Sequence, residues 1–266
     1  MQTTADRRNT DQDWNAIGAA EPFWGVLVQP QFKMDALTPQ AVEEFYTTGD
    51  HDMLRYTENF ERHFGPFRPK SALDFGCGVG RIAFAMAKGI PSVVGVDISE
   101  GMLARAAKYA ASRRIQNVEW MKELPNRTFD WVNTHIVLQH IPADRGLKII
   151  DQLLQRVNPG GWVSLHVVIY NEQGAEITAH QPVESIPPML MCCYPLGEVI
   201  QRFHQNDIID LAFLSTNHSP HGGLIIFGRR KEVVAGAHAS IRFLKRFLPL
   251  SLFRSPRHES QSSQAA

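Results

Sequence analysis

The sequence predicts an α/β fold built on a mostly parallel β-sheet. Two short apolar runs, Ser71 to Phe75 and Pro91 to Asp97, have the length and composition of buried strands. A helical segment, Arg81 to Lys88, lies between them and ends before Gly89. Alternating strands and helices are typical of a parallel sheet, and the apolar run from Trp162 to Tyr170 adds a further buried strand.

The loop after the first strand is rich in glycine. Gly76, Gly78 and Gly80 have no Cβ, so the backbone there can turn sharply and approach a ligand closely. The free amides at the start of the next helix face the same point and favour an electron-rich group. Asp97 ends the second strand, where an acidic side chain can accept both hydroxyls of a ribose. We therefore predict that this loop binds a nucleoside with a polar tail.

A helix predicted over Glu100 to Ala111 follows the second strand, with Ser99 as its N-cap. This geometry turns Ile98 and Met102 toward the adenine face of the ligand.

The spacing of the glycines separates two kinds of nucleotide cofactor. A dinucleotide fingerprint has its third glycine three residues beyond the second, whereas this loop reads Gly-x-Gly-x-Gly. Asp74, just before the loop, would repel a pyrophosphate but could accept hydrogen bonds from an ammonium group. The pattern therefore disfavours a nicotinamide dehydrogenase. The run Asp74 to Arg81 resembles the first motif of the class I S-adenosylmethionine (SAM)-dependent methyltransferases, of the small-molecule type.

Two later segments extend the resemblance. Thr128 to Ile141 is similar to the fourth strand of that family and the turn after it, and Gln152 to Trp162 is similar to the helix and Pro-Gly-Gly turn before the fifth strand. Asp207 to Ser215 and Gly222 to Arg229 read as an antiparallel hairpin. The resemblance implies a Rossmann-like, seven-stranded, mostly parallel sheet with an antiparallel C-terminal hairpin and helices on both faces.

The resemblance also implies SAM as the cofactor. We predict that the cofactor is bound by Asp74, Gly76, Cys77, Gly78, Gly80, Arg81, Asp97, Ile98, Met102, Thr134 and His135.

One departure from the family lies after the third strand. The family usually has an acid there that meets the adenine amino group, whereas Asn117 to Lys122 runs almost directly into Glu123. Three alternatives remain for the contact with the adenine amino group. Glu123 could make it, a backbone carbonyl near Lys122 could make it, or the pocket could be more open than is usual in the family. Glu123 can equally be a solvated loop charge.

The predicted organisation is a helical head at residues 1–66, a SAM-binding core at 67–232 and a tail at 233–266. The head has two short helical patterns, Pro39 to Tyr46 and Met53 to Phe60, and the resemblance to the methyltransferases implies that such helices cover the cofactor. Tyr46 and Arg55 could approach its amino acid end, or serve as a packed aromatic residue and a surface cation.

A proline- and methionine-rich segment at 171–195 is the leading candidate for a substrate lid. Met189, Met191 and Tyr194 would suit an adaptable apolar wall, or the loop could pack its own small core.

Methyl transfer needs a base only for some acceptors, and histidine titrates in the useful range. His135 and His140 both follow the fourth predicted strand, and we favour His140 as base for an oxygen acceptor. Either residue could instead be a hydrogen-bonded structural histidine. His166 lies inside a predicted buried strand and is expected to be a core residue.

Composition adds broad limits. With 27 basic and 27 acidic residues, the chain shows no global bias toward nucleic acid. It has no apolar run of transmembrane length and no secretion-signal pattern at its start, so we expect a cytoplasmic enzyme. Its three cysteines lack zinc spacing and are too few for a disulfide framework, and no metal site is predicted.

The tail differs from the rest. Residues 239–258 alternate basic and apolar side chains without an acid, which suits either an anionic membrane surface or docking on the core or a second subunit. Pro249 interrupts the segment and favours docking, and residues 259–266 are expected to be disordered.

Together these observations predict a SAM-dependent methyltransferase that modifies a small molecule or biosynthetic intermediate at oxygen. The alternative is a SAM- or nucleoside-binding regulatory protein without catalysis.

Overall fold

The computed structural model describes residues 9–172, 177–180, 186–218 and 221–232. The predicted tail at 233–266 lies outside the described residues, including the basic segment 239–258. Two parts of the candidate lid, 173–176 and 181–185, also lie outside them.

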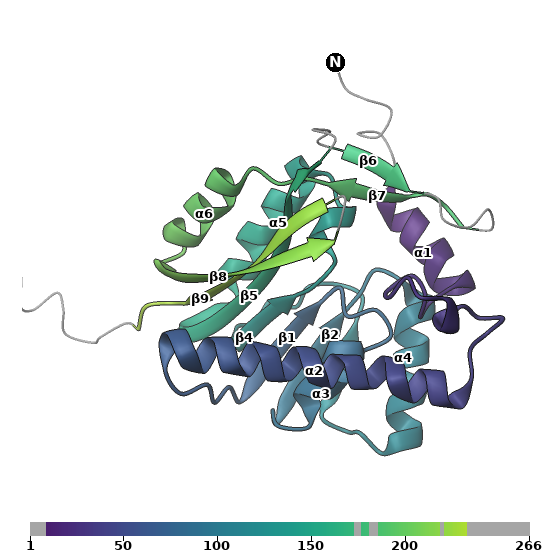
Figure 1. Cartoon of the computed structure of the whole chain (residues 1–266). Coiled ribbons are helices and arrows are strands. Elements are labelled where there is room, and N and C mark those ends of the chain that lie inside the picture. The colour runs from purple at the N-terminus through teal and green to yellow at the C-terminus, as the bar shows by residue number, and fades with distance from the viewer. Residues whose placement is uncertain (1–8, 173–176, 181–185, 219–220, 233–266) are drawn as a thin grey trace, which may run out of the picture. The chain divides into compact units, whose positions relative to one another are not determined.

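Seven strands form the main sheet, in the order β3-β2-β1-β4-β5-β9-β8 (Figure 1). They are β1 (Ser71–Phe75), β2 (Ser92–Val96), β3 (Val118–Met121), β4 (Phe129–Thr134), β5 (Val157–Asn171), β8 (Asp210–His218) and β9 (His221–Arg229). The first five are parallel, and β9 runs antiparallel to both β5 and β8. The predicted fold class is confirmed. Because the strand order reverses between β1 and β4, a ligand crevice is expected at their carboxyl ends.

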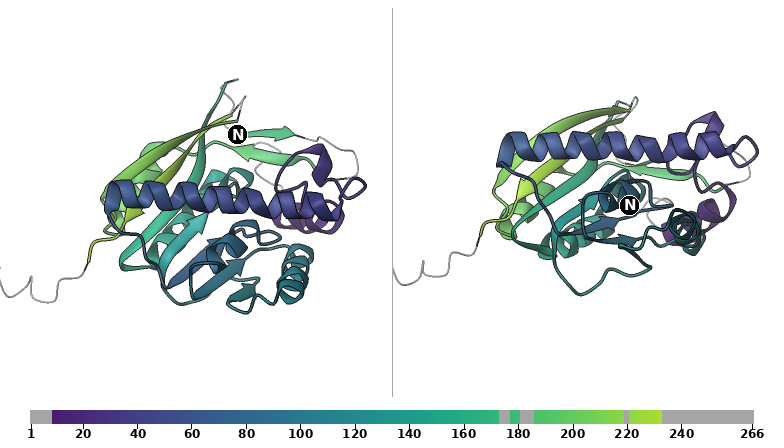
Figure 2. Two further views of the ribbon diagram at one scale, coloured as in Figure 1. Left: turned by 60° about the horizontal axis from the view of Figure 1, so that its bottom comes forward. Right: turned by 90° about the horizontal axis from the view of Figure 1, so that it is seen from below.

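Helices cover both faces of this sheet (Figure 2). On one face α5 (Ala143–Gln155) and α6 (Leu196–Gln205) pack through buried leucine, isoleucine, valine and phenylalanine side chains. On the other face lie α2 (Pro39–Phe64) and α3 (Arg81–Ala87), whose apolar residues meet Trp131 of the sheet. The helix α4 (Glu100–Arg113) belongs to a third cluster that also includes Phe84 of α3.

The head contains one long helix instead of the two short ones predicted. Thr38 caps α2 by accepting a hydrogen bond from the Ala41 amide at 3.1 Å, and the helix runs for 26 residues. Its buried aromatic side chains, such as Phe45 and Phe60, lie on both sides of the polar stretch that appeared to interrupt it. Gly49 lies within this stretch, where a Cβ would lie 2.1 Å from the Arg81 carbonyl oxygen. The close crossing of α2 over α3 therefore requires glycine at this position.

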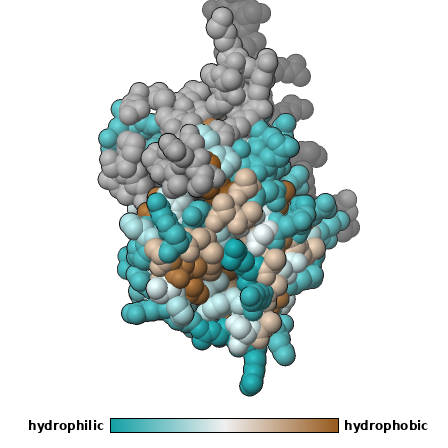
Figure 3. Space-filling view, turned by 90° about the vertical axis from the view of Figure 1, so that its right-hand side faces the viewer, coloured by the Kyte–Doolittle hydropathy of each residue, from teal (hydrophilic) through white to brown (hydrophobic). Residues whose placement is uncertain are grey.

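A helix that the sequence reading missed, α1 (Thr10–Ala20), precedes α2. The residue that marks the start of α1 in the sequence is Asn9, whose side chain accepts hydrogen bonds from two backbone amides of the first turn. The helix packs on the start of α4, where a Cβ on Gly18 would lie 2.0 Å from the Ser99 Oγ atom. Figure 3 shows the side of the molecule with α1 and α4, where hydrophobic residues gather near the middle and hydrophilic ones surround them.

Three short elements complete the described fold. These are the 3-10 helices η2 (Pro30–Phe32) and η3 (Leu138–His140), and a two-stranded sheet of β6 (Ile177–His180) and β7 (Met189–Cys192). None of the helices in the described part of the chain combines the length and apolar character that a membrane span needs.

Candidate functional site

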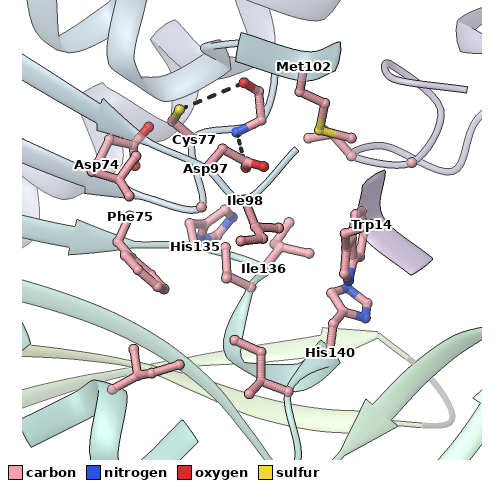
Figure 4. Close-up of a pocket in the computed structure, with 18 of the residues that line it drawn as sticks. Trp14, Asp74, Phe75, Cys77, Asp97, Ile98, Met102, His135, Ile136 and His140 are labelled. Carbon is pink, nitrogen blue, oxygen red and sulfur yellow. Dashed lines mark hydrogen bonds between the residues drawn. The ribbon is translucent and has the colours of Figure 1, made fainter. Parts of the chain in front are cut away.

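A cavity lies at the carboxyl ends of β1, β2 and β4 (Figure 4). Nine residues of the predicted cofactor set line it, namely Asp74, Gly76, Cys77, Gly78, Arg81, Asp97, Ile98, Met102 and His135. The other two do not. Gly80 is the N-cap of α3, with a φ of 87°, and Thr134 is buried at the end of β4.

Asp97 holds the glycine loop and the start of α4 together. One carboxylate oxygen accepts a hydrogen bond from the Gly78 amide at 2.8 Å, and the other accepts one from the Ser99 amide at 2.8 Å. Gly78 can point its amide this way because its φ of 54° lies in the left-handed region. Each carboxylate oxygen has a second lone pair, so the fixed carboxylate can still accept two hydroxyl protons. This is the arrangement that a ribose diol needs.

Asp74 belongs to a buried polar row that crosses three strands. It lies opposite Asn133, which in turn lies opposite Ser164. The Asn133 amide donates to Asp74 at 2.8 Å, and the Ser164 hydroxyl donates to Asn133 at 2.6 Å. Burial raises the pKa of Asp74 to about 7, although the Asn133 hydrogen bond and the nearby Arg81 oppose the shift. A cation bound beside Asp74 would therefore favour its ionised form.

A partly buried ion pair includes Arg81, which lines the cavity. Arg81 donates to Asp52 of α2 at 2.6 Å, and Nε2 of His135 lies 3.7 Å from the same carboxylate. The crossing at Gly49 brings Asp52 to this position, which no sequence motif marked. Tyr46 and Arg55, the head residues that could approach the amino acid end of the cofactor, do not line the cavity. Arg55 pairs with Asp52 from a partly exposed position.

Tyr46, the other head residue in question, points elsewhere. Its hydroxyl donates to the Val79 carbonyl at 3.1 Å, and its ring stacks on Tyr109 at 3.9 Å between centroids. Its role as a packed aromatic residue is the one that the geometry supports.

His140 lies on the opposite side of the cavity from Asp74, beside Trp14 of α1 (Figure 4). The two ring centroids are 4.9 Å apart. Nδ1 of His140 lies 2.7 Å from the Leu190 carbonyl oxygen, which can only accept, so Nδ1 carries the proton and Nε2 carries the lone pair. Burial lowers the pKa of His140 to about 4, so the ring is neutral at physiological pH.

The backbone between the two histidines is strained. Ile136 has a φ of 58°, a conformation that β-branched residues rarely adopt, and strain of this kind is concentrated at functional sites. This turn directs His135 toward Asp52, while His140 lies beside Trp14. His166 accepts a hydrogen bond from the Ile136 amide and contacts Thr216 at 2.9 Å. It is the buried, hydrogen-bonded core residue that its strand position predicted.

None of the described lid residues lines the cavity. Met189 and Tyr194 are buried, and Tyr194 contacts the turn that carries His140. On the adenine side, Lys122 and Leu124 line the cavity and Glu123 does not.

The side of the cavity around His140 is mainly apolar. Its lining includes Val137, Ile141 and Ile149, with Trp14 from the missed helix α1. Arg145 lies at this side and forms an ion pair with Asp11 of α1 at 2.7 Å. Within the described ranges, no group of three or more His, Cys, Asp or Glu side chains could hold a metal ion.

The sequence around this site matches a known family. Residues 72–161, from β1 into β5, match the family described as the methyltransferase domain. Residues 72–161 therefore form a methyltransferase domain. This methyltransferase domain includes the glycine loop, Asp97 and both candidate histidines.

Curated proteins share the same region. An uncharacterised methyltransferase of Mycobacterium tuberculosis is 35% identical over 106 residues, which are 38% of this chain and 51% of the relative. A ubiquinone biosynthesis O-methyltransferase of Paracidovorax citrulli is 30% identical over 113 residues, 40% of this chain and 47% of the relative. The chain thus spans about half the length of the curated relatives it matches.

Solved structures of low identity share the fold of the methyltransferase domain. The magnesium protoporphyrin IX methyltransferase of Synechocystis PCC 6803, with bound SAM, has a TM-score of 0.57 at 16% identity and covers 86% of this chain and 100% of its own. The cyclase SpnF has a TM-score of 0.51 at 18% identity, over 67% of this chain and 81% of its own. A cyclase on the same fold shows that the fold alone does not fix the reaction.

Proposed function

We propose that this protein transfers a methyl group from SAM to an oxygen atom of a small-molecule acceptor. One observation carries the proposal: a single cavity contains both the Asp97 carboxylate, held by two backbone amides, and a histidine with its tautomer fixed. The first feature suits a cofactor ribose and the second suits an acceptor hydroxyl.

The cofactor half of the cavity fits SAM in its polarity. Asp97 would accept the ribose hydroxyls, while Ile98 and Met102 lie beside it for the adenine. Asp74 and the Arg81 region would face the charged amino acid end. When bound, SAM supplies a methyl group on a positively charged sulfur.

His140 is proposed to hold the proton of the acceptor hydroxyl at Nε2. Because Leu190 keeps the proton on Nδ1, the Nε2 lone pair is available without a tautomer change. A pKa of about 4 makes His140 a weak base that is always neutral near pH 7. Most of the rate must then come from holding the acceptor oxygen in line with the methyl group. His135 is proposed to act with Asp52 in cofactor binding instead of proton transfer.

The lining supports a compact apolar acceptor. Val137, Ile141, Ile149 and Trp14 supply apolar walls near His140. The name of one relative, a ubiquinone biosynthesis O-methyltransferase, supports oxygen as the accepting atom. Balanced charge, with 27 basic and 27 acidic residues, supports a small acceptor over nucleic acid. We extend the proposal to a cytoplasmic location.

The test uses methyl-labelled SAM and a panel of small hydroxylated aromatic and alicyclic compounds. We expect label in at least one compound, with S-adenosylhomocysteine formed in equal amount. Binding of SAM by calorimetry without label transfer to any compound would favour the alternative, a non-catalytic SAM-binding regulatory protein. Label on nitrogen or carbon would retain the methyltransferase assignment and contradict the oxygen acceptor.

A further inference from the structure

The segment predicted as a substrate lid, residues 171–195, contacts the turn that contains η3 through Leu190 and Tyr194. The Leu190 carbonyl accepts from Nδ1 of His140 at 2.7 Å. Four residues further along, the Tyr194 hydroxyl lies 2.9 Å from the Leu138 carbonyl oxygen and 2.8 Å from that of Ile141. The contacts at Leu190 and Leu138 are buried and the one at Ile141 is partly buried, and together they hold the side chain of His140 and the two ends of the turn that carries it.

Tyr194 is itself held firmly. Its amide donates to the Val168 carbonyl of β5 at 2.7 Å, and its side chain is only 1% exposed. The phenol therefore links the central sheet to the turn. Removing its hydroxyl would leave the ring in place and delete only the contacts with the turn.

The space for the phenol is provided by a glycine in α5. A Cβ on Gly146 would lie 1.7 Å from the Tyr194 hydroxyl oxygen. Glycine is unfavourable within a helix, and its presence here gives the hydroxyl access to the turn. Gly146 and Tyr194 are far apart in the sequence, and the contact between the phenol and the turn depends on both.

The turn needs this support because the backbone before it is strained. Ile136, in the left-handed region, lies two residues before Leu138, and conformations of this kind persist only where the surroundings over-determine them. Leu138 also accepts the Ile141 amide at 2.9 Å, so its carbonyl is fixed from two sides.

We propose that Tyr194 is a positioning residue for His140, and that β7 with Tyr194 braces the turn instead of covering the substrate. The inference rests on the proposed function in assigning proton transfer to His140. The Leu190 carbonyl selects the tautomer, and the Tyr194 hydroxyl keeps the turn where that carbonyl can reach Nδ1.

The test compares the full chain with its Tyr194→Phe variant. Nitrogen-15 NMR of histidine-labelled protein reports the tautomer of His140, whose signals are assigned by their loss in His140→Ala. We expect one Nδ1-protonated form in the unchanged chain and a mixture of tautomers in Tyr194→Phe. Turnover should fall about 10- to 100-fold, since small misplacements of reacting groups have effects of that size. Calorimetric affinity for SAM should stay within about twofold, because Tyr194 does not line the cavity.

Three further variants sharpen the result. Gly146→Ala should reproduce the spectral change, because its Cβ occupies the place of the hydroxyl. Tyr170→Phe, a control at a 51% exposed tyrosine, should leave spectrum and turnover unchanged. Adding Tyr194→Phe to His140→Ala should cause no further loss of turnover, because the tyrosine is proposed to act only through the histidine.

The outcomes separate the two proposals. An unchanged His140 tautomer in Tyr194→Phe would overturn the positioning role, even if turnover fell. A mixed tautomer in Tyr194→Phe, with normal turnover in His140→Ala, would support the brace and contradict the role of His140 as base.

Discussion

The cofactor half and the acceptor half of the cavity are assembled in different ways. Most of the proposed cofactor half comes from one continuous stretch, Asp74 to Met102, in which a strand, a glycine loop, a helix and a second strand follow one another, and His135 and Asp52 join it from elsewhere in the chain. The acceptor half joins Trp14 of α1, His140 of η3 and, behind them, Leu190 of β7. The first is therefore fixed mainly by local chain geometry, and the second depends on tertiary contacts.

This difference predicts how each half responds to substitution. Changes in the cofactor half should alter SAM affinity directly, because its backbone amides and carboxylates form the binding surface. Changes in the acceptor half should alter turnover or acceptor affinity and leave SAM affinity nearly unchanged.

The largest expected effect is in the acceptor half. His140→Ala should lower kcat about 10²-fold, the lower end of the range for a positioned base because a pKa of about 4 makes His140 a weak one, with SAM affinity unchanged. In the unchanged chain kcat should decrease only as pH falls through about 4, because His140 then becomes protonated and can no longer accept a proton. Steady-state rates from pH 3 to 8 check both statements. A kcat within twofold of the parent would remove His140 from the chemistry.

The next effect tests the glycine loop. Gly78→Val should abolish detectable SAM binding, because the residue has a φ of 54° and a Cβ there would lie 3.1 Å from Val26. Gly89→Val is the matched control, since no heavy atom lies within 4 Å of a Cβ at that position. Titration calorimetry on both variants decides the matter, and equal affinities would show that the loop does not form the cofactor surface.

The stability of the folded chain should depend on pH through Asp74. Burial raises its pKa in the folded chain to about 7, above the ordinary value for an aspartate, so its contribution to stability is present at low pH and is lost as pH rises from about 4 to 7. The full effect has an upper bound of about 4 kcal/mol. Asp74→Asn should remove this pH dependence and be the more stable form at pH 8.

Urea unfolding without cofactor at pH 5 and pH 8 measures the difference. Parallel pH profiles for the two proteins would contradict the burial of an ionisable carboxyl at Asp74.

The smallest effect concerns the aromatic wall. Trp14→Ala should raise the KM for the acceptor about 2- to 10-fold, the range expected for loss of one aromatic contact. Trp14→Phe should recover most of the loss, and SAM affinity should stay within twofold for both. Initial rates at varied acceptor concentration test this, and a change confined to the KM for SAM would place Trp14 in the cofactor half.

The same division explains what the sequence could predict. Glycine spacing and the positions of Asp74 and Asp97 depend on neighbours within one strand and loop, so their meeting in one cavity was predictable from the sequence. The pairing of Asp52 with Arg81 depends on the crossing of α2 at Gly49, and the contact of Tyr194 with η3 depends on space left at Gly146. Such contacts leave no periodic signal in a single sequence.

The helix α1 is an intermediate case. Asn9, followed by acidic residues in the first turn, is a local signal for its start, and this signal was overlooked within a polar stretch. A correctly predicted α1 would still not have revealed the contact of Trp14 with His140. That contact depends on the packing of Gly18 against Ser99, which the sequence does not show.

The central claim is that the Asp97 carboxylate, fixed by two amides, holds the cofactor. Its most direct test is titration calorimetry of SAM into the full chain and into Asp97→Ala, with Asp35→Ala as a control at an exposed acid. The account predicts one site in the parent and control, and affinity about 10- to 100-fold weaker in Asp97→Ala, the usual loss for charged hydrogen bonds. No SAM binding by the parent, or equal affinity in all three proteins, would contradict it.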